Sequence, residues 1–244
     1  MSLVSIVMPS FNSGETISKS IISVIEQTYT NWELLIVDDC STDNTISIIN
    51  SFDDERIKLF KLNINSGSPV SPRNLAINEA AGDYISFLDS DDLWSSDKLE
   101  TQISNMTSNG YFISHSSYHR IDEFDVPLNV VSAPSVVSFD RLLYGNCIGN
   151  LTGIYNCKVL GKFYQKNIGH EDYLMWLEIL SKNNSIGITK PLASYRVLSK
   201  SVSSNKFRAL YWHYNILRNE LKINPFKACY YMCFYLFNAF TKRL

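Results

Sequence analysis

The 244-residue sequence predicts an α/β fold, with a mostly parallel sheet flanked by helices and a C-terminal amphipathic, aromatic helical tail. Between residues 3 and 88, short apolar runs rich in Val and Ile alternate with stretches of helical periodicity. That alternation is typical of a parallel sheet covered on both faces. Polar and acidic residues follow the apolar runs, where such sheets bind their ligands. We therefore expect the functional residues at the carboxyl edge of the sheet.

Local patterns predict the individual elements. Ser13 would cap a helix over 13–25 whose apolar residues recur on one face. Ser71 would cap a helix over 71–81, with Pro72 in its first position. The expected strands are 3–8, 32–37, 57–62, 84–88, 111–119 and 186–195, and further helices are expected after Thr42, at 139–144 and at 171–180.

The chain is expected to form one domain with a tail. No Gly/Pro/Ser-rich linker divides it, and 45% of its residues are hydrophobic, enough for one sizeable core. Residues 1–205 would form the domain, in two halves, 1–105 and 106–205. Residues 206–244 would form the helical tail.

The charges are distributed unevenly along the chain. There are 22 Lys/Arg and 24 Asp/Glu, a formal net charge of −2, which excludes a protein that depends on nucleic-acid phosphates. From residue 196 to residue 244, nine basic residues accompany one acid, a net charge of +8, and the remainder carries −10. A basic tail rich in aromatic residues is typical of a segment that lies on an anionic membrane surface. The alternatives for this tail are a packed helix and a homodimer contact.

The cysteines and the apolar segments indicate the compartment. The five cysteines are scattered and form no CxxC pair, so neither a disulfide framework nor a zinc site is indicated. The amino terminus lacks the basic region of a secretory signal, and the longest apolar stretch, 228–240, is shorter than the ~20 residues of a membrane span. We expect a cytoplasmic protein bound peripherally to the inner face of the cell membrane.

A cluster of carboxylates ends the apolar run at 84–88. Asp89, Asp91 and Asp92 lie within four residues, and no glycine-rich phosphate loop follows any expected strand. Such acids repel one another unless a cation is present, and Mg²⁺ and Mn²⁺ bind carboxylates together with phosphate oxygens. The cluster therefore indicates a metal-bridged diphosphate. The alternative is that these acids cap the next helix in solvent.

Two further groups could join this site. Asp38 and Asp39 end the second expected strand, and Arg73 lies in the first turn of a helix that faces the same crevice. Each alone is also compatible with a helix cap or a surface residue. Glu171 and Asp172 open an apolar helix, where a carboxylate could be a general base or could only complement the helix dipole.

Four segments resemble successive motifs of the family 2 glycosyltransferases. They are VSIVMPSFN (4–12), LLIVDDCSTDNT (34–45), NSGSPVSPRNLA (65–76) and GDYISFLDSDDLW (82–94). The match is specific over residues 3–100 and looser over 169–204. The resemblance implies a GT-A fold and inverting transfer of a sugar, usually from a UDP-sugar, to an acceptor hydroxyl. Residues 1–105 would then be the nucleotide-sugar-binding half and 106–205 the acceptor half.

The resemblance also implies roles for individual residues. Asp39 would contact the nucleotide base, and Arg73 would lie near the base and the phosphates. Asp91 would bind Mn²⁺ or Mg²⁺. Asp172 would be the catalytic base, with Glu171 as the reserve candidate because one residue of helix rotation exchanges the two. The other nucleotide-sugar-binding residues would be Pro9, Phe11, Glu15, Asp38, Asp89 and Ser90.

The implied acceptor is an oligosaccharide or a lipid-linked saccharide, such as a sugar on polyprenyl diphosphate in O-antigen or capsule assembly. A sugar-nucleotide pyrophosphorylase is disfavoured, because it would carry an early glycine-rich loop with Arg and Lys where this chain has Pro-Ser-Phe-Asn after Met8. The alternative function is a non-catalytic nucleotide-sugar-binding subunit of a polysaccharide assembly complex.

Overall fold

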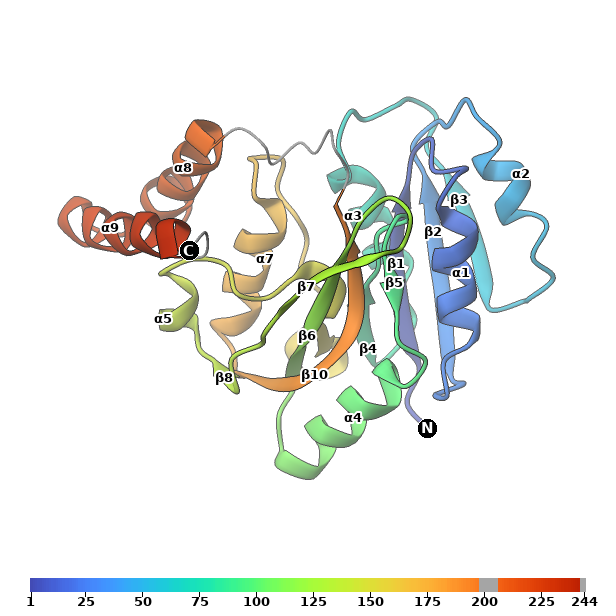
Figure 1. Ribbon diagram of the computed structural model, residues 1–244, viewed down its shortest axis with the longest axis horizontal. Coiled ribbons are helices and arrows are strands. Elements are labelled where there is room, and N and C mark those ends of the chain that lie inside the picture. The colour runs from blue at the N-terminus through green and yellow to red at the C-terminus, as the bar shows by residue number, and fades with distance from the viewer. Residues whose placement is uncertain (198–205, 242–244) are drawn as a thin grey trace.

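One mixed sheet runs through the protein (Figure 1). The computed structural model describes residues 1–197 and 206–241, with side chains described for 1–197 and 208–236. The strands are β1 (Val4–Ser10), β2 (Trp32–Asp38), β3 (Ile57–Lys61), β4 (Tyr84–Phe87), β5 (Leu93–Trp94), β6 (Ile113–Ile121), β7 (Pro127–Val131), β8 (Val136–Val137), β9 (Ile154–Asn156) and β10 (Ser185–Arg196). Their order is β3-β2-β1-β4-β9-β6-β10-β5, with β7 paired to β6 and β8 paired to β10. Strands from both halves of the chain therefore share one sheet.

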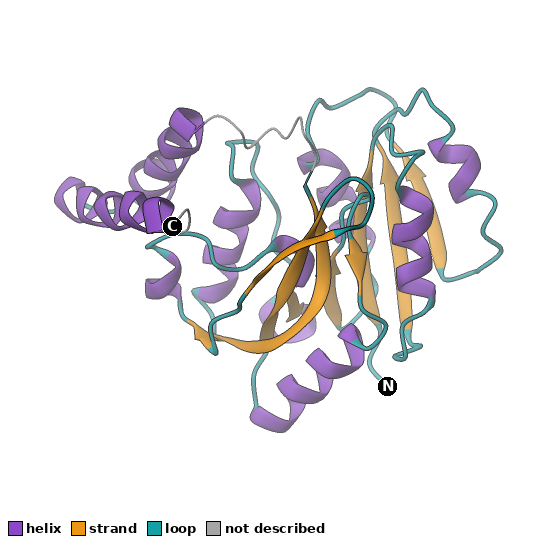
Figure 2. Ribbon diagram, in the orientation of Figure 1, coloured by secondary structure: helices purple, strands orange, loops and turns teal. Residues whose placement is uncertain are grey.

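Helices cover both faces of the sheet (Figure 2). They are α1 (Ile17–Ile25), α2 (Thr45–Ile49), α3 (Val70–Glu79), α4 (Lys98–Asn109), α5 (Phe139–Leu142), α6 (Cys157–Leu160), α7 (Glu171–Leu180), α8 (Lys206–Asn215) and α9 (Pro225–Thr241), with the short turns η1 (Asn150–Thr152) and η3 (Ile216–Glu220). Helices α1, α2 and α4 pack on one face, and α3 and α7 pack on the other. The result is a three-layer arrangement in which the loops at the strand ends stay accessible.

Alternation along the strands explains why both faces are covered. In β1, Ile6 and Met8 join the core beside α1, whereas Val7 joins the core beside α3 and α7. Successive side chains of a strand point to opposite faces, so a strand that is apolar throughout must be buried on both sides. Each fully buried aliphatic side chain contributes about 2 kcal/mol. This burial makes the sheet a rigid support for the loops that follow β1, β2 and β4.

The structure confirms the expected α/β class with a central sheet flanked by helices. Parallel pairing holds for β3-β2-β1-β4 and for β6 with β10. The short strands β5, β7, β8 and β9 are antiparallel additions that the sequence pattern did not predict. With two to five residues each, they are too short to show a clear hydrophobic period.

Two expected helix caps are wrong. The N-cap of α1 is Thr16, because the Ser13 Oγ instead bonds the carbonyl of Phe11 and lies 2.7 Å from the Ser90 Oγ. Helix α3 begins at Val70, so Ser71 lies inside its first turn. Ser13 thus belongs to the loop that borders the sheet edge, whereas Ser71 belongs to the helix that it was expected to cap.

The C-terminal helices pack beside α7, on the side of the molecule away from α1 and α2 (Figure 1). Ile216, Leu217 and Ala228 are buried in the same core as α7. Over residues 1–197 and 206–241, no helix combines the length and the apolar character that crossing a bilayer requires.

Candidate active site

The loops after β1 and β2 are tied together at the carboxyl edge of the sheet. Asn12 lies at φ 47 and accepts a hydrogen bond from the Thr42 backbone N–H at 2.8 Å. The Gly14 N–H donates to the Asp43 carboxylate at 3.0 Å. Because β1 lies between β2 and β4 in parallel register, these loops stand next to the turn that follows β4. The structure thus brings the predicted site residues that follow β1, β2 and β4 to one edge of the sheet.

Asp38 and Asp39 organise this edge from within. Asp38 is fully buried, and its carboxylate accepts from the backbone N–H and the Oγ of Ser41 at 2.9 and 2.5 Å. Asp39 is 4% exposed and accepts from the backbone N–H and the Oγ of Ser66 at 2.8 and 2.9 Å. The two acids hold the loop after β2 and the loop before α3 at this edge.

The residues predicted after β1 differ in exposure. Pro9 is buried within β1, opposite Val37 of β2. Phe11 is 50% exposed and Glu15 is exposed, both in the loop that contacts Ser90 through Ser13. Phe11 and Glu15 are therefore available to a ligand at the sheet edge, whereas Pro9 supports the loop from below.

Arg73 is an interior residue that joins three segments. It is 6% exposed, and its Nη2 lies 2.6 Å from the Asp89 Oδ1. Its Nη1 lies 3.3 Å from the Gln165 Oε1 and 3.9 Å from the Glu171 Oε1. Burial alone would lower the pKa of Arg73, but Asp89, Asp172 and Glu171 together raise it above its ordinary value. The surface location that we weighed for Arg73 is wrong, and its guanidinium links the turn after β4 to the start of α7.

Two buried donors beside this ion pair have no hydrogen-bond partner among the described residues. They are the Nε of Arg73 and the Nε2 of Gln165. Buried polar atoms are nearly always hydrogen-bonded in folded proteins, so such a pair marks a place where a ligand or water oxygen would fit. Arg73 pairs with Asp89, and Gln165 contacts Arg73, so both donors lie beside this ion pair of the predicted site.

The acidic turn after β4 contains carboxylates in three different environments. Asp89 is paired with Arg73, and Asp92 is 1% exposed and accepts the Arg196 backbone N–H at 2.9 Å. No Lys, Arg or His side chain within the described ranges pairs with the Asp91 carboxylate. Burial, followed by the nearby charge of Asp89, raises the pKa of Asp91 to about 6. Burial and then Asp91 also raise the pKa of Asp92.

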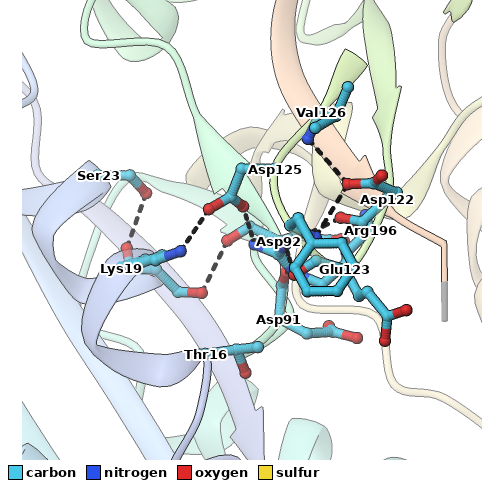
Figure 3. A network of polar contacts seen from close by, with 12 residues as sticks. Thr16, Lys19, Ser23, Asp91, Asp92, Asp122, Glu123, Asp125, Val126 and Arg196 are labelled. Atoms are coloured by element: carbon cyan, nitrogen blue, oxygen red, sulfur yellow. Dashed lines mark hydrogen bonds and ion pairs between the residues drawn. The ribbon is translucent and has the colours of Figure 1, made fainter. Parts of the chain in front are cut away.

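Arg196 fixes the backbone of this turn (Figure 3). It is 3% exposed, and its Nε donates to the Asp91 carbonyl at 2.8 Å. Its Nη1 donates to the Asp122 carbonyl at 3.1 Å, and its Nη2 pairs with Asp125 at 2.6 Å. Lys19 of α1 pairs with the same Asp125 carboxylate. Arg196 therefore joins the end of β10, the acidic turn and the β6–β7 hairpin.

The sequence analysis missed this function of Arg196, which it counted only among the charges of the basic tail. The signal that could have indicated it is position: a lone arginine at the end of the apolar strand 186–195. A parallel strand end predicts nearness to the site, but it does not show which way a long side chain points.

Glu171 and Asp172 stand at the start of α7, opposite the acidic turn. Asp172 lies 3.4 Å from the Asn146 Nδ2 and makes no ion pair in the described part of the chain. Burial, followed by the charge of Glu171, raises the pKa of Asp172. A partly buried carboxylate with a raised pKa is the type of group that accepts a proton in catalysis.

The carboxylates of this site offer a metal ion few protein ligands. In residues 1–197 and 206–241, no group of three His, Cys, Asp or Glu side chains is arranged to hold an ion. The Asp89 carboxylate pairs with Arg73, and the Asp92 carboxylate accepts the Arg196 backbone N–H. Among the described residues, the Asp91 carboxylate has neither kind of partner from another segment. A divalent ion here would therefore have one principal carboxylate ligand and would need ligand oxygens from a diphosphate or water.

A sheet of this order, with a buried arginine and acidic turns at its carboxyl edge, is the architecture of GT-A proteins. The Glycosyl transferase family 2 model matches residues 5–157, and the chain belongs to this family. Residues 1–349 of Staphylococcus aureus TarS, in complex with UDP-GlcNAc, have the same fold, with a TM-score of 0.75 and 21% identity over 97% of this chain and 72% of that fragment.

Curated relatives match nearly the whole chain. An Escherichia coli protein named UDP-Glc:alpha-D-GlcNAc-diphosphoundecaprenol beta-1,3-glucosyltransferase WfgD is 40% identical over 96% of this chain and 92% of its own. The putative teichuronic acid biosynthesis glycosyltransferase TuaG of Bacillus subtilis is 36% identical over 99% of this chain and 98% of its own.

Proposed function

We propose that this glycosyltransferase moves a sugar from a UDP-sugar to a hydroxyl of a polyprenyl-diphosphate-linked saccharide, with inversion, in surface polysaccharide assembly. The observation that carries the proposal is the joining of the acidic turn and the α7 acids through Arg73, at the sheet edge of a family 2 chain. Through this pairing the acidic turn and the first turn of α7 contact the same buried guanidinium, which supports a shared site for the donor and the candidate base. The name of the relative WfgD supports UDP-glucose as the first donor to test.

In this proposal each site residue has a separate role in the transfer reaction. Asp39, with the Ser66 loop, forms the wall of the nucleotide pocket, and Asp89 is held in place by Arg73. Asp172 takes the proton of the acceptor hydroxyl as that oxygen attacks the anomeric carbon. The bond from that carbon to the diphosphate breaks on the opposite face, so the configuration inverts. One carboxylate base suffices, because the diphosphate is a good leaving group.

Mn²⁺ or Mg²⁺ is proposed as the cofactor, with Asp91 as its protein ligand. When bound, the ion would offset the negative charge that develops on the departing diphosphate. The unpaired Asp91 carboxylate and its raised pKa support this role, because a cation beside it would favour the charged form.

The C-terminal helices are proposed to lie on an anionic membrane surface. Tyr211, Phe226 and Tyr230 are 66%, 87% and 52% exposed, and Glu220, the one acid of 206–241, pairs with Lys166. An open apolar hollow of about 420 Å³ between α8 and α9 could accept a lipid chain. The residues that line it are Leu210, Tyr211, Tyr214, Cys229, Met232 and Leu236.

Release of UDP by the purified protein tests the function. We expect release from UDP-glucose with Mn²⁺ or Mg²⁺ that requires a GlcNAc-diphosphate-lipid acceptor and stops with a chelator. UDP-galactose and the N-acetyl forms of both sugars serve as donor controls. Metal-dependent UDP binding without release for any donor and acceptor would instead favour the non-catalytic binding subunit.

A further inference from the structure

Helix α8 packs against the residues that precede the two candidate bases. The ring of Trp212 meets the ring of His170 edge to face, with centroids 5.3 Å apart and an interplanar angle of 80°. A Cβ added at Gly169 would lie 2.3 to 2.5 Å from the Cε2, Cδ2 and Nε1 atoms of Trp212. The indole therefore lies flush against the backbone of Gly169, with no room for a side chain between them.

The next residue of α8 contacts the other side of the acid pair. His213 is 1% exposed and stacks on Tyr173, with ring centroids 5.1 Å apart. On its opposite face it stacks on Tyr235 of α9 at 4.3 Å. Consecutive residues of α8 thus bracket Glu171 and Asp172 from both ends.

The start of α7 has no side-chain cap that could replace this contact. Gly169 and His170 both lie in the left-handed region, at φ 75 and 52, and the His170 side chain makes no capping hydrogen bond. A left-handed conformation costs a non-glycine residue free energy, and an uncapped first turn frays readily. Packing by Trp212 is the contact that holds this turn in the conformation observed.

We propose that Trp212 is a positioning residue for the transferase reaction. By holding the Gly169–His170 turn, it sets the direction in which the first turn of α7 presents Asp172 to the acceptor hydroxyl. The inference rests on the proposed function, since it takes Asp172 as the base. It assigns α8 to the acceptor half of the catalytic site, in addition to any role of the tail on a membrane.

Small displacements of a base have large kinetic effects. A shift of about 1 Å in a reacting group can reduce the rate about 100-fold, because proton transfer needs the two oxygens at hydrogen-bond distance. The donor pocket is formed by the loops after β1 and β2, which the structure ties to each other and not to α8. Loss of the Trp212 contact should therefore affect the transfer step and leave donor binding unchanged.

Two pairs of variants test the proposal in the full-length protein. Trp212→Leu should reduce kcat for acceptor-dependent transfer by about tenfold or more, with the KM for the UDP-sugar and the affinity for UDP within about twofold of wild type. Asn219→Ala is the control, because Asn219 is exposed in the η3 turn that continues from α8, lies outside the hollow between α8 and α9, and should keep wild-type kcat. Trp212→Phe keeps an aromatic ring against His170 and should recover most of the rate.

The second pair of variants distinguishes two causes of a lower kcat, a steric clash with the Trp212 indole and strain of the backbone. Gly169→Ala should lower kcat as Trp212→Leu does. Gly161→Ala is the control, since Gly161 also has a positive φ, 86, but a Cβ there meets no atom within 4 Å. If Gly161→Ala lowers kcat as much, strain alone accounts for the effect and the proposal is wrong.

The outcomes distinguish this proposal from the function on which it rests. If the wild type transfers sugar and Trp212→Leu transfers it at the same rate, Trp212 does not position the base although the function stands. If kcat falls together with UDP affinity, Trp212 supports the whole fold and the proposal is overturned. If the wild type releases no UDP with any donor and acceptor, the proposed function fails first.

Discussion

Asp172 and Glu171 are adjacent in sequence and differ in their surroundings. Glu171 lies 3.9 Å from Arg73, whereas Asp172 makes no ion pair among the described residues and has a raised pKa. Because a base needs a free lone pair, we expect Asp172→Asn to lower kcat by about 10²- to 10⁴-fold. Glu171→Gln should lower it much less.

The control for this pair is Asp140→Asn, which changes an exposed acid in the first turn of α5, outside the site. It should leave kcat unchanged. Equal losses for Asp172→Asn and Glu171→Gln, with both proteins folded by circular dichroism, would contradict the assignment of the base.

Buried histidines make stability depend on pH. Burial is the largest cause that lowers the pKa of His115 and of His213 to about 4, below the ordinary value of 6.5. As pH falls below 6.5, these histidines bind protons in the unfolded chain but stay neutral in the folded chain. The free energy of unfolding therefore falls between pH 6.5 and about 4. Each histidine can remove up to about 3 kcal/mol over this window.

Thermal unfolding at pH 7.5 and pH 5 measures this effect. His213→Phe keeps a ring between Tyr173 and Tyr235 but cannot be protonated, so its midpoint should fall less between the two pH values than that of the wild type. An unchanged difference between the two pH values would show that His213 does not contribute.

At the scale of elements, the acidic turn depends on the end of β10. Arg196 is buried and bonds the Asp91 carbonyl, the Asp122 carbonyl and Asp125, so its loss leaves buried acceptors without donors. We expect Arg196→Gln to lower the free energy of unfolding by about 3 kcal/mol in urea denaturation. Lys19→Gln is the matched control, because Lys19 pairs with the same Asp125 from an exposed position and should cost less than about 1 kcal/mol.

Similar losses from both variants would show that Arg196 acts only through Asp125. In that case the bond to the Asp91 carbonyl would not hold the acidic turn, and the interpretation of Figure 3 would be wrong.

Elements with a strong hydrophobic period were predictable, and those defined by tertiary pairing were not. The runs that became β1, β2 and β4 are apolar on both faces, so the sequence alone indicated their burial and their parallel order. Strands β7 and β9 exist because β6 and β4 present free edges to them. The start of α3 was misplaced by two residues, because Pro69, and not Ser71, precedes its first turn.

The site was predictable by position and much less by contact. Because the carboxyl ends of parallel strands meet at one edge of a sheet, the sequence predicted that the acids after β2 and β4 lie together there. The inward direction of Arg73 and the parts played by Arg196 and Trp212 depend on contacts between segments far apart in sequence. The separation is 92 residues for Arg73 and Gln165, 105 for Arg196 and Asp91, and 42 for Trp212 and His170. A single sequence carries no local signal for such contacts. The roles given to the site residues remain predictions for the variants above.

At the scale of the whole molecule, exposed aromatic residues and cations gather on the C-terminal helices. We expect the protein to sediment with vesicles that contain anionic lipid, and to be released as salt rises, since the attraction of Lys and Arg to headgroups is screened. Phe226→Ser should weaken sedimentation, because Phe226 is 87% exposed at the start of α9. Phe124→Ser, at a 76% exposed position in the β6–β7 hairpin, is the control and should bind as wild type does.

Equal weakening by both variants would mean that general hydrophobicity, and not the tail, controls vesicle binding. Binding that ignores salt and lipid charge would contradict the electrostatic part of the proposal.

The strand order has a consequence for synthesis of the chain on the ribosome. β1 emerges first, but one of its two neighbours, β4, follows only after about 80 further residues. β10, which lies between β6 and β5 in the sheet, is complete only at residue 196. Until then β6 and β5 lack a partner that the finished sheet provides. The nascent protein therefore carries open strand edges through most of its translation, when pairing with other chains is a hazard, and it should be more dependent on chaperones than a protein whose neighbouring strands are consecutive.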